Sequence, residues 1–189
     1  MRSIIRFFSL LFIVLTNIGA TSAQDEIHWS PDYNLKWADF KGDTSFAQHY
    51  AEKAVTKIRI EATTAIYKNH YTFSVPCIFE KNNSWTVNDT SVSLLLHEQL
   101  HFDIGEAFAR DLRKKLAEMD DVSDYTIKER VKTLYHEVNN ACIAYEKKYD
   151  IETNHGKNPE KQAIWQKRIN AILQSTAKHQ SITFTVSKQ

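Results

Sequence analysis

The sequence predicts an α+β fold, in which a small antiparallel sheet packs with about three helices. Two observations lead to this expectation. Before residue 88, short runs alternate apolar with polar residues, which is the period of a half-buried strand. After residue 88, apolar residues recur at steps of three and four over long runs, which is the period of a helix with one buried face. No repeat and no linker rich in glycine or proline divides the chain.

The predicted strands lie mainly in the first half of the chain. Before them, the segment 27–42 combines large aromatic side chains with turn residues, and we expect it to pack on the core. Lys68–Asn69 form the expected hairpin corner between the two longest runs. The expected strands cover residues 58–62, 69–75, 85–87 and 182–186.

Three helices are expected, and each has a signal at its start. The first should extend to about Met119, and the second should end before a polar loop at residues 150–157. The starting signals are Asp89 or Thr90 as an N-cap, Thr126 with Glu129 as a capping box, and Asn158–Pro159 as a cap and first turn.

The first 23 residues are typical of a secretory signal. Arg2 and Arg6 give a positive start, residues 7–15 are apolar, and the small residues 21–23 precede polar Gln24. We therefore expect residues 1–23 to be removed and residues 24–189 to form a single domain that is secreted or periplasmic. No stable membrane span is expected after cleavage, and an uncleaved anchor is the alternative.

The balance of charge argues against a nucleic-acid partner. The chain contains 24 Lys+Arg and 23 Asp+Glu, and loss of Arg2 and Arg6 with the signal changes the net charge from +1 to −1. No basic block is interleaved with aromatic residues. The sequence leaves the oligomeric state open.

Only two cysteines are present, Cys77 and Cys142. Because the chain is expected in an oxidising compartment, a single disulfide between them is the natural pairing, with two buried free thiols as the alternative. Neither cysteine has a second Cys or His at the spacing of zinc ligands.

The stretch His97-Glu98-Gln99-Leu100-His101 predicts a metal site on the first helix. Positions four apart lie one above the other on a helix, so both imidazoles can reach one zinc ion. Glu98, next to the first His, is then the candidate general base. A catalytic zinc usually has three protein ligands, so a third must come from elsewhere.

Three residues are candidates for this third ligand. Glu106 ranks last, because it lies about half a turn away from His97 around an unbroken helix. Glu137, on the second helix, could supply a carboxylate ligand, as a glutamate from a following helix does in some zinc peptidases. His155 lies in a polar loop beside Gly156, where a His has no role in packing, and it is our choice.

At these positions the chain resembles the bacterial domain-of-unknown-function 922 family, generally described as predicted secreted zinc-dependent proteases. The resemblance covers most of the chain after the signal, and it implies that the 149–156 loop belongs with the metal site. The residues that carry it are Trp29, Leu35, Trp37, Asp39, Phe40, Gly42, the run 97–104, Tyr149, Asp150, Thr153, His155, Gly156, Gln162 and Trp165.

Two further residues are candidates for supporting roles. Asp150 could orient a ligating imidazole through its second ring nitrogen, or it could simply end a helix. Tyr149 could donate to a developing oxyanion, although it also completes the apolar stripe of its helix, which favours core packing.

The leading hypothesis is a secreted zinc peptidase in which His97, His101 and His155 hold Zn²⁺ and Glu98 activates water toward a peptide bond of a peptide or protein substrate. The first helix is then a zincin-like active-site helix. Two alternatives remain: a non-catalytic envelope protein with a structural zinc site closed by Asp150 or Glu152, and a zinc amidase acting on cell-wall peptides.

Overall fold

The computed structural model describes residues 25–45, 47–49, 52–120 and 122–188. The predicted signal, residues 1–23, lies outside these residues. Eight strands and three long helices form the described part, with the long helices in the second half as the sequence predicts. The strands are β1 (Glu26–His28), β2 (Ala54–Val55), β3 (Ile58–Ile60), β4 (Thr63–Ile66), β5 (His70–Ser74), β6 (Cys77–Glu80), β7 (Trp85–Thr86) and β8 (Thr183–Ser187). The helices are α1 (Val92–Ala117), α2 (Ile127–Thr153) and α3 (Pro159–Ser175).

One long hairpin organises the strands, and all pairs are antiparallel. Its first arm is β3 followed by β4, and its second arm is β5 followed by β6. Ile60 lies opposite Cys77 and Thr63 opposite Ser74, so the register is unbroken along both arms. β8 pairs with β5, β1 pairs with β6, and β2 pairs with β7. The α+β class with small antiparallel sheets is therefore confirmed.

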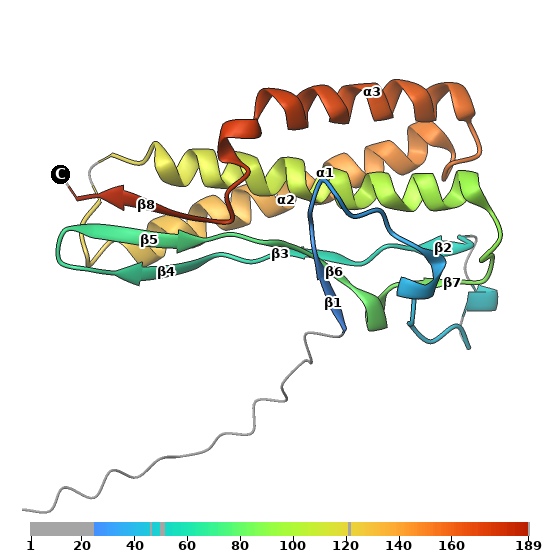
Figure 1. Cartoon of the computed structure of the whole chain (residues 1–189), viewed down its shortest axis with the longest axis horizontal. Coiled ribbons are helices and arrows are strands. Elements are labelled where there is room, and N and C mark those ends of the chain that lie inside the picture. Colours follow the sequence, from blue (N-terminus) through green and yellow to red (C-terminus); the bar gives the residue numbers. More distant parts are fainter. Residues whose placement is uncertain (1–24, 46, 50–51, 121, 189) are drawn as a thin grey trace, which may run out of the picture.

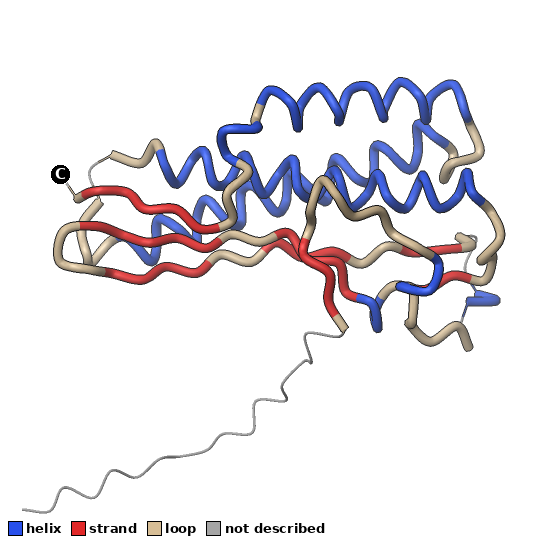
Figure 2. Tube along the Cα trace, viewed as in Figure 1, coloured by secondary structure: helices blue, strands red, loops and turns tan. Residues whose placement is uncertain are grey.

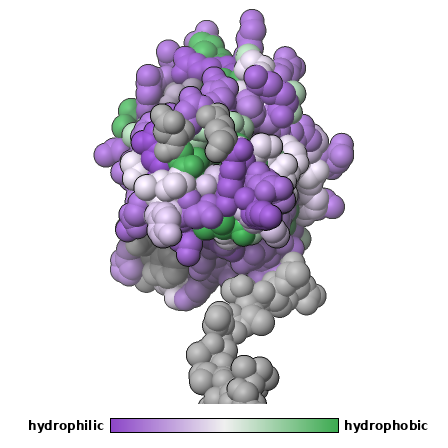
Figure 3. Space-filling view, turned by 90° about the vertical axis from the view of Figure 1, so that its left-hand side faces the viewer, coloured by the Kyte–Doolittle hydropathy of each residue, from purple (hydrophilic) through white to green (hydrophobic). Residues whose placement is uncertain are grey.

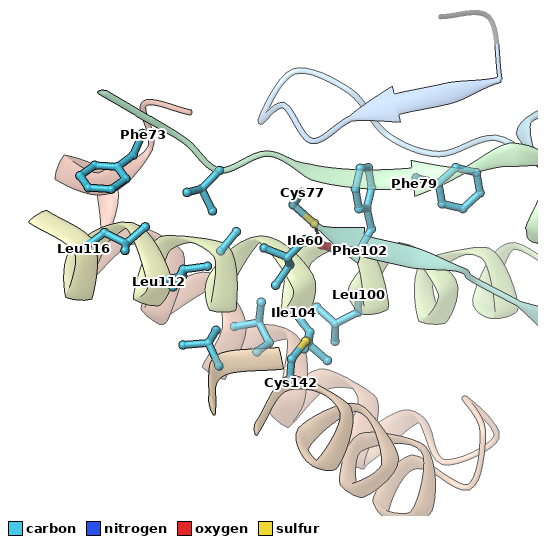
Figure 4. Packing of buried hydrophobic residues seen from close by; sticks show 14 of the residues in the cluster. Ile60, Phe73, Cys77, Phe79, Leu100, Phe102, Ile104, Leu112, Leu116 and Cys142 are labelled. Atoms are coloured by element: carbon cyan, nitrogen blue, oxygen red, sulfur yellow. Dashed lines mark hydrogen bonds between the residues drawn. The ribbon is translucent and has the colours of Figure 1, made fainter. Parts of the chain in front are cut away.

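The helices form a layer on one side of the strands (Figures 1 and 2). Helix α1 lies between the strands and the other two helices, and its central part is buried on every side. Figure 4 shows Phe73 and Phe79 reaching from the strands toward Leu112, Leu116 and Phe102 of α1. Because α1 is enclosed in this way, polar side chains on it are also buried, and each needs a partner.

The surface agrees with this inward placement of apolar side chains. The end of the molecule that carries the β4–β5 turn is mainly hydrophilic, with small separate hydrophobic patches (Figure 3). No helix among the described residues is both long and apolar enough to cross a membrane.

The helix starts agree only in part with the sequence prediction. Ser91, rather than Asp89 or Thr90, caps α1 and accepts from the Leu94 N–H at 3.2 Å. Asn158 caps α3 as predicted, through the Lys161 N–H at 3.1 Å. The capping box predicted for α2 is wrong, because the Thr126 hydroxyl bonds to Ser123 instead.

The end of α2 also differs, and this matters for the site. The helix continues through Asp150 to Thr153, and it ends where Asn154 adopts a left-handed conformation with φ 50°. His155 and Gly156 follow with φ 51° and 75°. Asp150 is therefore a helical residue, one turn after Glu146 on the same face.

The predicted disulfide does not form. Cys77 and Cys142 are free thiols, and both are buried. Cys77 lies on β6 on the strand side of α1, whereas Cys142 lies on α2 on the opposite side, so that α1 separates them (Figure 4). Burial raises the pKa of both thiols, which keeps them protonated and unreactive.

Candidate metal and active site

Three side chains from two helices converge on one point. His97 and His101 extend from the same face of α1, and Asp150 reaches them from α2. Oδ1 of Asp150 lies 3.1 Å from Nε2 of His97 and 3.0 Å from Nε2 of His101. One ligand atom from each residue lies within 4.8 Å of the other two, which is close enough for a single metal ion to contact all three.

The second nitrogen of each imidazole also has a partner. Nδ1 of His97 lies 3.2 Å from Oε1 of Gln162, and Nδ1 of His101 lies 3.4 Å from Oε1 of Glu146. Both partners offer an acceptor oxygen to Nδ1, and each Nε2 turns toward Asp150. Metal-binding histidines are usually oriented in this way.

Tyr149 and Gly156 hold the His97 ring in place. The Tyr149 ring stacks on His97 with centroids 4.6 Å apart, and its hydroxyl lies 3.1 Å from the His97 carbonyl oxygen and 2.9 Å from Oε1 of Gln162. The loop also approaches His97 closely, because a Cβ on Gly156 would lie only 2.9 Å from Cβ of His97. Tyr149 is fully buried, and burial raises its pKa, so the structure gives this residue a packing and orienting role.

The local charges favour a cation at the convergence point. Burial alone would lower the pKa of His101, but hydrogen bonds to Asp150 and Glu146 raise it to about 10. Asp150 shows the opposite balance, because its bonds to His101 and His97 outweigh burial and hold its pKa well below the usual range. A metal ion would take the place of the protons that these groups share.

Glu98 lines the cavity into which this cluster opens. The cavity has a volume of about 640 Å³, and its wall includes His97, His101, Asp150 and the strand β2. The Glu98 side chain is 3% exposed, and within the described residues no hydrogen bond or ion pair engages its carboxylate. A buried carboxylate that no hydrogen bond engages among the described residues, beside three converging ligand atoms, is positioned to exchange a proton with a bound molecule.

The comparisons with known proteins add one match. Residues 20–156 match the family described as "Bacterial protein of unknown function (DUF922)". The chain belongs to this family. No curated protein and no solved structure matches it. The matched region of this DUF922 protein includes the whole His97, His101 and Asp150 cluster, whereas Gln162 lies beyond it.

His155, the predicted third ligand, lies at the rim of the cluster in this DUF922 chain. It lines the same cavity, and its Nδ1 is 3.8 Å from Oδ1 of Asp150, but its side chain is 41% exposed. The group of close ligand atoms contains Asp150 in its place. Extension of α2 past Asp150 explains the difference, since the helix aims this carboxylate at the two imidazoles.

The two alternative third ligands lie elsewhere. Glu106 is buried and bonded to Arg110 and Arg113. Glu137 is on the outer face of α2, where it pairs with Lys115 at 2.9 Å. Neither carboxylate is in the group of close ligand atoms.

Sequence reasoning assigned no role to Glu146 or Gln162, although both contact the imidazoles of the DUF922 site. A signal was available for Glu146, because it lies four residues before Asp150 and so shares its helix face. Gln162 is among the residues that carry the family resemblance, but no spacing links it to His97, which it reaches only because α3 folds back against α1.

Proposed function

We propose that this protein is an exported zinc-dependent peptidase, in which His97, His101 and Asp150 hold the metal and Glu98 is the general base. The observation that carries the proposal is the convergence of two Nε2 atoms and one carboxylate oxygen beside a cavity that Glu98 also lines. The chemistry of these donors suits zinc, which binds imidazole and carboxylate groups with an open fourth position in catalytic sites. Export rests on the signal-like residues 1–23.

A zinc ion bound there would supply Lewis acidity, acidifying a water and polarising a carbonyl oxygen. Glu98 would accept the proton of the attacking water and deliver it to the leaving amine. Gln162 and Glu146 would keep both imidazoles turned toward the metal. Strand β2 forms one wall of the cavity, where it would align the substrate backbone.

A closed zinc site is the second candidate function. It is favoured by one observation, the 3.8 Å separation between His155 and Asp150, which would allow a fourth protein ligand. Glu152 is not the candidate for that position, because it accepts from the Trp165 indole at 2.9 Å. In a closed site zinc would be structural, and Glu98 would have no water to activate.

The deciding experiment measures zinc content and peptide hydrolysis in the wild type, Glu98→Gln, Asp150→Ala and His155→Ala. We expect one zinc per wild-type chain, loss of zinc in Asp150→Ala, and retention in His155→Ala. Glu98→Gln should keep zinc and lose hydrolysis. Zinc that resists chelators and depends on both Asp150 and His155 would support the closed site, and hydrolysis by Glu98→Gln would refute the assigned base.

A further inference from the structure

A groove continues from the candidate active site along the edge of the strands. The 640 Å³ cavity shares Thr56 and Glu146 with a neighbouring cavity of about 410 Å³. That cavity in turn shares Arg59 and Ile60 with a third one of about 790 Å³. The three cavities are therefore consecutive parts of one groove, which we call the edge groove.

The two walls of the edge groove are a strand and a helix. Every residue from 52 to 64 lines one of the three cavities. Because strand side chains alternate between two faces, a cavity lined by consecutive residues must follow the edge of the strand. The other wall is one face of α2, formed at steps of three and four by Lys128, Val131, Lys132, Tyr135, His136, Asn139, Cys142, Ile143, Glu146 and Asp150.

The backbone along this edge is free to pair. The Glu61 N–H donates to Pro76, the Lys57 carbonyl accepts from Glu80, and the Lys53 carbonyl accepts from Val87. Odd-numbered residues therefore bond to the neighbouring strands, and even-numbered residues from 54 to 64 turn their N–H and C=O groups the other way. Among the described residues, no strand pairs with this edge and no hydrogen bond engages these groups.

We propose that the edge groove binds an unfolded segment of a polypeptide substrate as an added strand and leads it to the candidate active site. This inference rests on the proposed function, and it names the substrate class as extended, unstructured polypeptide. Addition of a strand to an open edge is a recurrent mode of peptide recognition. Residues 54–64 span about 33 Å in an extended strand, so the bound segment would contain about ten residues.

The side chains of the groove favour recognition of the backbone over recognition of one sequence. Both signs of charge are present, with Lys128 and Lys132 on one wall and Glu61 on the other. Arg59 already pairs with three glutamates. Ile143 offers an apolar contact near the middle, where its side chain is 57% exposed. We therefore expect many unfolded sequences to bind.

Amide exchange followed by NMR tests the proposal directly. The protein is the full chain carrying Glu98→Gln and loaded with zinc, and the probe is reduced, carboxymethylated α-lactalbumin, which is unfolded. Native α-lactalbumin is the folded control. The unfolded probe should slow exchange at least tenfold at the amides of residues 56, 58, 60, 62 and 64, and the folded control should not. No slowing, or slowing at residue 56 alone, would overturn the proposal.

A matched pair of variants tests the helix wall. Ile143 and Ile164 are exposed to similar extents, 57% and 50%, but only Ile143 is among the residues that line the groove. Ile143→Ser should weaken binding of the unfolded probe about tenfold, whereas Ile164→Ser should not change it. Equal affinities in the two variants would contradict a role for this wall.

The same samples separate this proposal from the proposed function. Protection of the even-numbered amides without any hydrolysis by the wild type would uphold the groove and refute the peptidase. Hydrolysis of the probe without that protection would uphold the peptidase and refute the groove.

Discussion

Helix α1 carries two buried polar clusters whose partners differ in kind. Near its start, His97 and His101 converge with Asp150 at the wall of an open cavity. Two turns later, Glu106 accepts from Arg110 at 2.8 Å and from two nitrogens of Arg113 at 2.8 and 3.1 Å. The same two guanidinium groups also donate to backbone carbonyl oxygens. Arg110 donates to Leu173, and Arg113 donates to Val75 and His179.

The difference separates a structural cluster from the proposed functional one. The Glu106 cluster matches donors to acceptors within the protein, and it joins α1 to the strands and to the end of α3. The His97 cluster brings together groups that prefer a cation, and among the described residues no hydrogen bond or ion pair engages the Glu98 carboxylate beside it. Burial alone is therefore no indication of function, whereas burial around ligand atoms that converge on a cavity is one.

The largest expected effect comes from breaking the structural cluster. Glu106→Gln leaves two buried guanidinium groups without their counter-charge, and we expect it to lower the free energy of unfolding by about 3–5 kcal/mol. Urea denaturation measures this. Glu137→Gln is the matched control, because its pair with Lys115 is exposed, and it should cost less than about 1 kcal/mol. Equal losses of unfolding free energy in the two variants would show that the buried cluster and the exposed pair contribute equally to stability.

A smaller effect is expected when the orienting partner of His97 is removed. Gln162→Leu should lower zinc affinity by about 10- to 100-fold, since Nδ1 loses its acceptor. Gln162→Glu keeps an acceptor oxygen and should restore binding. Gln166→Leu, one turn later on α3 and bonded to Asn170, should bind zinc like the wild type. Competition with a chromogenic chelator gives the affinities, and a full-affinity Gln162→Leu would show that the contact does not orient the ring.

Gly156 has a left-handed backbone conformation and lies directly against His97 of the candidate site. Gly156→Ala should destabilise the protein by about 1–2 kcal/mol, because φ is 75° and the new Cβ would press on His97. Asn154→Gly, also at a left-handed position, should change stability by less than about 0.5 kcal/mol. Thermal unfolding of the metal-free protein compares them, and a neutral Gly156→Ala would mean that the loop relaxes freely away from His97.

The smallest effect concerns Asp103, about one turn before Glu106 on α1, where it accepts from Trp29 and Gln99. Burial raises its pKa despite these bonds. Its contribution to stability is therefore fully present below the ordinary carboxyl pKa near 3.8 and is lost as the pH rises through the raised folded value. In urea denaturation at a series of pH values, Asp103→Asn should reduce this loss of unfolding free energy with rising pH. An unchanged slope would place the pH dependence in another group.

The sequence predicted the elements that depend on local pattern. Alternation located β3 and β5 in the two arms of the hairpin, and the periodicity of residues 94–116 located α1. It missed β1, β2, β4 and β6, which are short or lack alternation and exist through pairing with other strands. The disulfide prediction was wrong for a similar reason, because compartment and count do not reveal that α1 lies between the two thiols.

For the site, the sequence by itself determined that His97, Glu98 and His101 share one stretch of helix, since spacing on a helix fixes which side chains are neighbours. Only the tertiary structure decided what meets them. Asp150 lies 49 residues after His101 and reaches it because α2 packs against α1, and Gln162 arrives on α3 in the same way. Contacts between helices depend on packing across long separations in sequence, and no local spacing encodes them.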